Sequence, residues 1–81
     1  MRVTVRVFAR LRDIVGSSEL VRDAKPGETI RGVWRDLASD YPELATYERS
    51  ISAAVNAEYA KMDRVIGDGD EVAFLPPVSG G

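Results

Sequence analysis

Hydrophobic and polar residues alternate along the first part of the chain. Val3, Val5 and Val7 are separated by single polar residues, which is the two-residue period of a half-buried β-strand. The valines are therefore predicted to face the core. Phe8 continues the alternation on the outward face, where a large aromatic side chain is unusual.

The last apolar stretch of the chain has the same period. In a strand predicted over residues 71–75, Val72 and Phe74 face the core. Ala73 and Leu75 therefore face outward. The Gly-Asp-Gly-Asp sequence before this strand is a strong turn signal.

Shorter elements are predicted between these two strands. A helical turn is expected over residues 10–15, because Gly16 is a favourable residue directly after a helix. A second strand is expected over residues 19–24. A third is expected over residues 51–56, followed by a tight turn and a brief strand around Tyr59.

One segment has the period of an amphipathic helix. Apolar residues recur at intervals of three and four from Ile30 to Tyr41. Thr29 can cap the first turn, and Pro42 cannot continue the helix. Trp34 lies in the apolar stripe and is predicted to be a core residue.

This order of elements predicts an α+β fold of the β-grasp, or ubiquitin-like, type: a mixed β-sheet with one main helix packed on one face. In that arrangement the first and last strands lie side by side, parallel, in the middle of the sheet. Phe8 and Leu75 would then be neighbours on the face that the helix does not cover. We predict a β-grasp domain over residues 1–75 and a flexible tail over residues 76–81, and leave residues 43–50 unassigned.

Composition and charge narrow the chemistry. The 81 residues make one domain, and 11 basic against 13 acidic residues give a net charge of −2. That balance lacks the basic excess typical of nucleic-acid binding. The chain has no cysteine and no histidine, so it lacks a thiol nucleophile and the commonest general base. We therefore expect no self-contained catalytic apparatus.

Membrane and metal functions are also disfavoured. No run approaches the roughly 18 apolar residues of a membrane span, and the start of the chain lacks the apolar stretch of a signal peptide. A cytoplasmic protein is therefore expected. Asp68, Asp70 and Glu71 could suggest a cation site, but too few spaced ligands follow for an EF-hand-like loop. A solvated turn is the favoured interpretation, and no metal site is expected.

The C-terminal segment has an unusual design. Its prolines end the strand and hold the chain extended. Six extended residues reach roughly 20 Å, enough to enter a deep pocket in another protein. Its glycines, without Cβ atoms, can pass a narrow channel and let a nucleotide come close. An inert, frayed end is the alternative interpretation. The segment consists of Pro76, Pro77, Val78, Ser79, Gly80 and Gly81.

Such a tail suits delivery of a terminal carboxylate. A carboxylate is a poor electrophile, but adenylation by an ATP-dependent partner would give it a good leaving group. A sulfur nucleophile could then replace AMP and leave a thiocarboxylate at Gly81. The absence of cysteine fits this chemistry, because no internal thiol could capture the activated group.

Three parts of the chain resemble a known family. They are residues 7–12 with Gly16, residues 53–56 and residues 68–81, and the resemblance covers essentially the whole length. The family is that of the MoaD/ThiS sulfur carriers. The Pro-Pro-Val-Ser sequence before Gly-Gly is most similar to the MoaD-like branch, the small subunits of molybdopterin synthase. Leu75 departs from the phenylalanine expected in some relatives.

The resemblance implies specific roles. Gly81 would be adenylated, converted to a thiocarboxylate, and would donate sulfur to cyclic pyranopterin monophosphate to form molybdopterin. Residues 76–80 would insert into the large synthase subunit, without which the chain would be inactive. Phe8, Leu75 and Tyr59 would form an apolar docking face shared by that subunit and the activating enzyme.

The implied partners are the large subunit, an E1-like adenylating enzyme, and a sulfur donor such as a cysteine desulfurase or rhodanese. AMP and sulfur would be held only transiently at Gly81, with no stably bound cofactor. Neither nucleic acid nor a membrane is an expected partner.

Three alternatives remain open from the sequence. The chain could carry sulfur for another pathway, such as thiazole synthesis, tRNA thiolation or tungsten-cofactor assembly. It could be a ubiquitin-like modifier that joins Gly81 to lysines of target proteins. It could also be a β-grasp interaction domain with an inert terminus, which the terminal motif disfavours most strongly.

Overall fold

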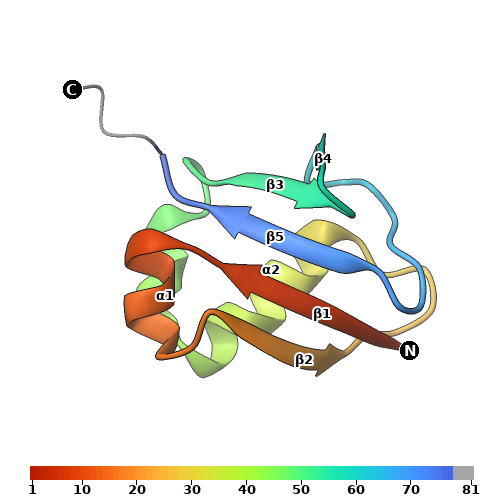
Figure 1. The fold of residues 1–81 in the computed structure, drawn as a ribbon, viewed down its shortest axis with the longest axis horizontal. Coiled ribbons are helices and arrows are strands. Elements are labelled where there is room, and N and C mark those ends of the chain that lie inside the picture. The colour runs from red at the N-terminus through yellow and green to blue at the C-terminus, as the bar shows by residue number, and fades with distance from the viewer. Residues whose placement is uncertain (78–81) are drawn as a thin grey trace.

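A five-stranded mixed sheet forms the framework of the protein in a computed structural model, which describes residues 1–77 (Figure 1). The strand order is β2-β1-β5-β3-β4, and the main helix packs on one face. This confirms the predicted β-grasp fold. The elements are β1 (Arg2–Val7), α1 (Ala9–Val15), β2 (Glu19–Asp23), α2 (Ile30–Asp40), the 3₁₀-helix η1 (Pro42–Tyr47), β3 (Ser52–Val55), β4 (Glu58–Ala60) and β5 (Glu71–Leu75).

The first and last strands lie side by side in the sheet and run parallel, as predicted. The three valines of β1 are buried, and so are Val72 and Phe74 of β5. Trp34 of α2 packs edge-on against Phe74, with ring centroids 5.0 Å apart. This buried contact fixes the helix against the central strand. Because α2 covers one face of the sheet, the opposite face stays open.

The ends of α2 follow its sequence signals. The Thr29 hydroxyl accepts a hydrogen bond from the Gly32 backbone N–H at 3.1 Å, which caps the first turn. The helix ends before Pro42, as predicted. The segment left unassigned, residues 43–50, overlaps η1, in which Pro42 takes a first-turn position and Leu44 is buried in the core.

No helix within residues 1–77 has the length and apolar character needed to span a membrane.

Candidate docking face and carrier tail

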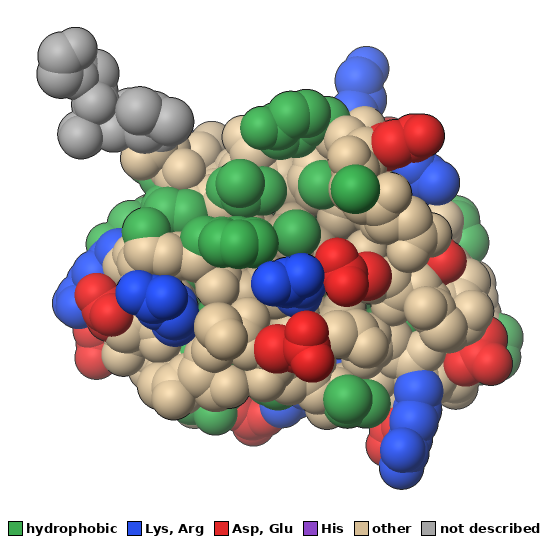
Figure 2. Space-filling model, viewed as in Figure 1, with side chains coloured by type: hydrophobic (Ala, Val, Ile, Leu, Met, Phe, Trp, Pro, Cys, Tyr) green, Lys and Arg blue, Asp and Glu red, His purple; other side chains and the backbone are tan. Residues whose placement is uncertain are grey.

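The face of the sheet opposite α2 carries a shallow hollow of about 260 Å³. Figure 2 shows hydrophobic side chains gathered on this face over β5 and β3, with charged side chains beside them. We call this face, with its hollow, the docking face. The residues that line the hollow are Arg6, Phe8, Ala54, Ala57, Tyr59, Glu71, Ala73 and Leu75.

The strand register explains how these residues meet. Arg6 on β1 is paired with Ala73 on β5, and Ala73 is paired with Ala54 on β3. Ala54 is in turn paired with Tyr59 on β4. One row across four strands therefore runs from a guanidinium, over two alanines, to a phenol. The alanines form a low floor because neither side chain extends beyond Cβ.

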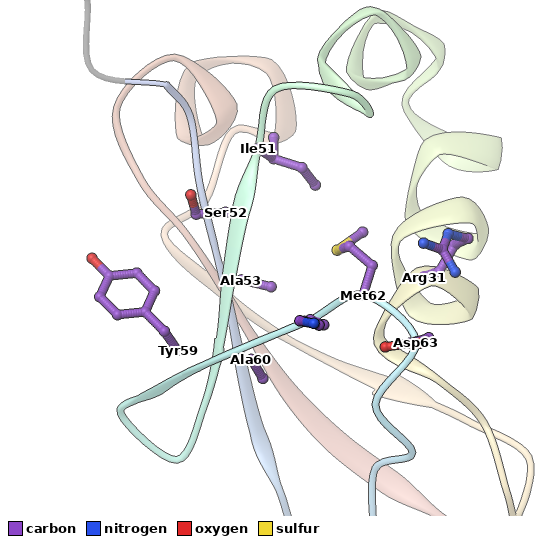
Figure 3. A pocket seen from close by; sticks show the side chains of 9 residues that line it. Arg31, Ile51, Ser52, Ala53, Tyr59, Ala60, Met62 and Asp63 are labelled. Carbon is purple, nitrogen blue, oxygen red and sulfur yellow. The ribbon is translucent and has the colours of Figure 1, made fainter.

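The apolar walls come from the three residues proposed for docking. Phe8 is 39% exposed and Tyr59 is 78% exposed, while Leu75 is half-buried. Figure 3 shows Tyr59 on the side of β3 away from α2, with Met62 and Arg31 on the other side. The predicted placement of Phe8 and Leu75 on the uncovered face is confirmed, and Tyr59 joins them there. Their role in binding a partner stays a prediction.

Arg6 forms a polar border to the hollow. Its guanidinium lies 5.8 Å from the centre of the Phe8 ring, in a cation–π contact. It also lies between two acids, with N–O distances of 4.0 Å to Glu19 and 3.8 Å to Glu71. From the sequence alone, the interpretation of Arg6 is surface charge around the docking patch. Its position two residues before Phe8 in the alternating pattern was the available signal for this contact.

The turn that precedes Tyr59 is held by side chains. Asn56 and Ala57 both have positive φ angles, 50° and 71°, which are costly for residues other than glycine. Asn56 compensates by donating to the Asp70 carboxylate at 3.0 Å and accepting from the Glu71 backbone N–H at 3.0 Å. This network fixes the turn from β3 to β4 against the start of β5, and so positions one wall of the docking face.

Asp70 is the acidic centre of that network. Its carboxylate accepts the Gly67 backbone N–H at 2.7 Å as well as the Asn56 amide. These bonds, that from Gly67 first, lower the pKa of Asp70 below its ordinary value of 3.8. Asp68 similarly accepts the Arg2 backbone N–H at 2.9 Å. Both carboxylates therefore brace turns, and residues 1–77 contain no cluster of three potential metal ligands.

The Asp70→Asn variant is expected to unfold more easily at neutral pH. Because the carboxylate has a lower pKa folded than unfolded, it stabilises the fold above its unfolded pKa, and that contribution disappears as pH falls through the folded value. The expected loss at pH 7 is below about 1 kcal/mol, since water screens the charge of this partly exposed group.

Chemical denaturation from pH 7 to pH 2 tests this expectation, with exposed Asp63→Asn as the control. The wild-type free energy of unfolding should fall more on acidification than that of Asp70→Asn. Equal pH dependence of these two proteins would contradict the role given to Asp70.

A second hollow, of about 430 Å³, lies on the other side of β3 (Figure 3). It opens between the start of α2 and the β3–β4 edge, with Ile51 and Met62 half-buried and Arg31 and Lys61 exposed around it. Of the candidate residues from the sequence, Tyr59 lines this hollow as well as the one on the docking face.

The tail begins where the docking face ends. Leu75 closes β5, and Pro76, which is half-buried, and Pro77, which is exposed, follow it directly. The predictions for Val78, Ser79, Gly80 and Gly81 lie outside the described residues. The division into a domain and a tail therefore stays a prediction.

Comparison with known proteins identifies the family. The profile of the ThiS family matches residues 5–81, nearly the whole chain. This chain belongs to the ThiS family. One relative is the Escherichia coli "molybdopterin synthase sulfur carrier subunit", which is 39% identical to this chain. The alignment covers 98% of this chain and 99% of that protein. The Arabidopsis thaliana protein of the same name is 30% identical over 100% of this chain and 84% of its own length.

The solved structures that are similar to this ThiS-family chain include proteins described in different ways. SAMP1 from Haloferax volcanii has a TM-score of 0.84 at 27% identity, with both chains fully covered. A putative molybdopterin converting factor subunit 1 from Pyrococcus furiosus has a TM-score of 0.85 at 27% identity, covering 96% of this chain and 99% of that one. A Helicobacter pylori complex of molybdopterin-converting factor subunits 1 and 2 matches at a TM-score of 0.69 over the full length of both chains. At 23% identity it shows only that the fold is shared.

Proposed function

We propose that this chain is a sulfur carrier, and specifically the sulfur-carrier subunit of a molybdopterin synthase. One observation carries the proposal: strand β5 supplies both the floor and wall of the docking face, through Ala73 and Leu75, and the base of the tail. A protein that binds this face is therefore positioned to receive the tail. The names of the curated relatives support the choice of pathway.

The proposed chemistry takes place at the Gly81 carboxylate. One carboxylate oxygen attacks the α-phosphorus of ATP, pyrophosphate leaves, and an acyl-adenylate forms. Hydrosulfide, or the terminal sulfur of a donor persulfide, then attacks the acyl carbon and AMP leaves. With a persulfide, a second donor thiol releases the thiocarboxylate and becomes part of the donor's disulfide. Gly80 and Gly81 present no Cβ that would obstruct attack on this carbon.

Sulfur transfer returns Gly81 to its starting state. In each of two transfers, the thiocarboxylate sulfur attacks a side-chain carbon of the pterin precursor and displaces an oxygen substituent, and water then attacks the acyl carbon, which leaves sulfur on the pterin and restores the Gly81 carboxylate. Because the chain has no histidine or cysteine, we assign the acids, bases and substrate-binding groups for this step to the large subunit. The carrier alone is thus inactive.

The proposal includes three partners and a compartment. The large subunit and an E1-like adenylating enzyme bind the docking face in turn, and a cysteine desulfurase or rhodanese supplies sulfur. AMP and sulfur stay at Gly81 only between steps. The carrier acts in the cytoplasm, where ATP is available for its activation.

A protein modifier is the second candidate function. The observation in its favour is the similarity in fold to Haloferax volcanii SAMP1, also described as a small archaeal modifier protein. The activation step would be the same, but a lysine amine of a target protein would replace sulfur as the nucleophile and form an amide with Gly81.

A comparison of acceptors tests the proposed pathway. Purified thiocarboxylated protein is offered separately to a molybdopterin synthase large subunit with cyclic pyranopterin monophosphate, to a thiazole synthase with its substrates, and to cell extract with ATP. We expect sulfur transfer to the pterin and none of the other products. Thiazole formation or covalent attachment to lysines, without molybdopterin, would replace this assignment with the corresponding alternative.

A further inference from the structure

We infer that the hollow on the docking face is a socket for one uncharged aromatic side chain of the protein that receives the tail. This inference rests on the proposed function and adds the chemistry of the contact. It follows from the size of the hollow, its walls and floor, and the charges at its border.

The size of the hollow favours a protein side chain as its occupant. At about 260 Å³ it is smaller than the roughly 300–1,000 Å³ typical of sites for small molecules. Its floor is low because Ala54 and Ala73 are adjacent in the strand register. Longer residues at either position would fill it.

The walls favour an aromatic ring. Phe8 and Tyr59 come from opposite sides of the row, and both are exposed enough to contact a partner. Aromatic rings gain about 0.5–1.5 kcal/mol from edge-to-face or offset contacts beyond their burial. Aromatic residues are also enriched among the anchors that occupy pockets at interface centres.

The border disfavours a charged occupant. Arg6 is the cation that lines the hollow and Glu71 is the anion, and their 3.8 Å contact balances the two charges. Glu19, on the other side of Arg6, adds a second acid to this border. A partner carboxylate would be repelled by both glutamates. A partner cation would have to displace Arg6 from its contacts with them.

The Phe8 ring and the backbone turn before Tyr59 are also held in place before a partner arrives. Arg6 lies over the Phe8 ring, and the Asn56–Asp70 network fixes the turn that leads to Tyr59. A socket whose walls are already ordered loses less conformational entropy on binding. Such a site suits a single anchoring side chain.

Filling the socket tests the inference. We expect Ala73→Leu to weaken binding to the large synthase subunit by at least about tenfold, as overpacking of a fitted contact does. Ala73→Ser, which keeps the side chain small, is the matched control and should bind within about threefold of wild type. Because Ala73 is half-buried, thermal unfolding of both variants is measured alongside, and Ala73→Met serves if the leucine variant does not fold.

A complementary change in the partner completes the test. Each exposed aromatic residue of the large subunit is changed to alanine, and one change should restore binding of Ala73→Leu while weakening binding of the wild type. Normal binding by Ala73→Leu, or a loss that no aromatic change restores, would overturn the socket. Failure of the wild type to bind this subunit would instead overturn the proposed function. The same variants measured against the ATP-dependent activating enzyme would then decide the socket.

Discussion

Removal of Gly81 is expected to abolish sulfur loading and leave the fold intact. The new terminal carboxylate would lie one residue, roughly 3.3–3.6 Å, short of its position in the activating enzyme. Misplacement of a reacting group by even about 1 Å can cost about 100-fold in rate. The fold should be unaffected, because the sheet, α2 and the core lie within residues 1–75. One extra residue after Gly81 should have the same effect, because the carboxyl group of Gly81 would then be part of a peptide bond.

Intact-mass analysis after incubation with ATP, activating enzyme and a sulfur source measures this effect. Wild type should gain the mass of one oxygen-to-sulfur exchange, and so should Lys25→Ala, a change at an exposed residue. Normal loading of the shortened chain would show that Gly81 is not the reactive residue.

Acidic substitutions on the docking face have the second large expected effect. Burial of a phenylalanine or leucine side chain is worth about 1.5–3 kcal/mol, so Phe8→Asp or Leu75→Asp should weaken binding to either partner by roughly 10-fold to 100-fold. Val21→Asp is the matched control. Val21 is 57% exposed and is paired with Thr4 on β1, away from the hollow, so this variant should bind normally.

Binding titrations with the large subunit and the activating enzyme, together with thermal unfolding of each variant, give the result. The free energy of unfolding of Phe8→Asp should be close to that of wild type. Equal losses of binding for Val21→Asp and Phe8→Asp would mean that charge on the sheet, and not the apolar docking face, governs the interaction.

The fold was predictable because its signals are local. Alternation defined β1 and β5, and an apolar stripe with a threonine cap defined α2. The placement of Phe8 beside Leu75 followed from that alternation once the two strands were set parallel. The 3₁₀-helix η1 was not predicted, because one buried residue, Leu44, gives too short a period to recognise.

The candidate site was only partly predictable, because its polar contacts join distant segments. Asn56 bonds Asp70 across 14 residues, and Arg6 reaches both Glu19 and Glu71. No spacing rule connects such residues before the strand register is known. The proposed chemistry at Gly81 came instead from the sequence of the tail and the family resemblance.

Single-turnover sulfur transfer tests the central claim most directly. Purified thiocarboxylated protein is mixed with the large subunit and cyclic pyranopterin monophosphate, with two carriers supplied for each pterin, without ATP or a sulfur source. Molybdopterin should form as the carrier's mass returns to that of the ordinary carboxylate, and the carrier without the large subunit should keep its sulfur. Binding of the carrier by the large subunit without molybdopterin formation, while Gly81 keeps its sulfur, would contradict the account.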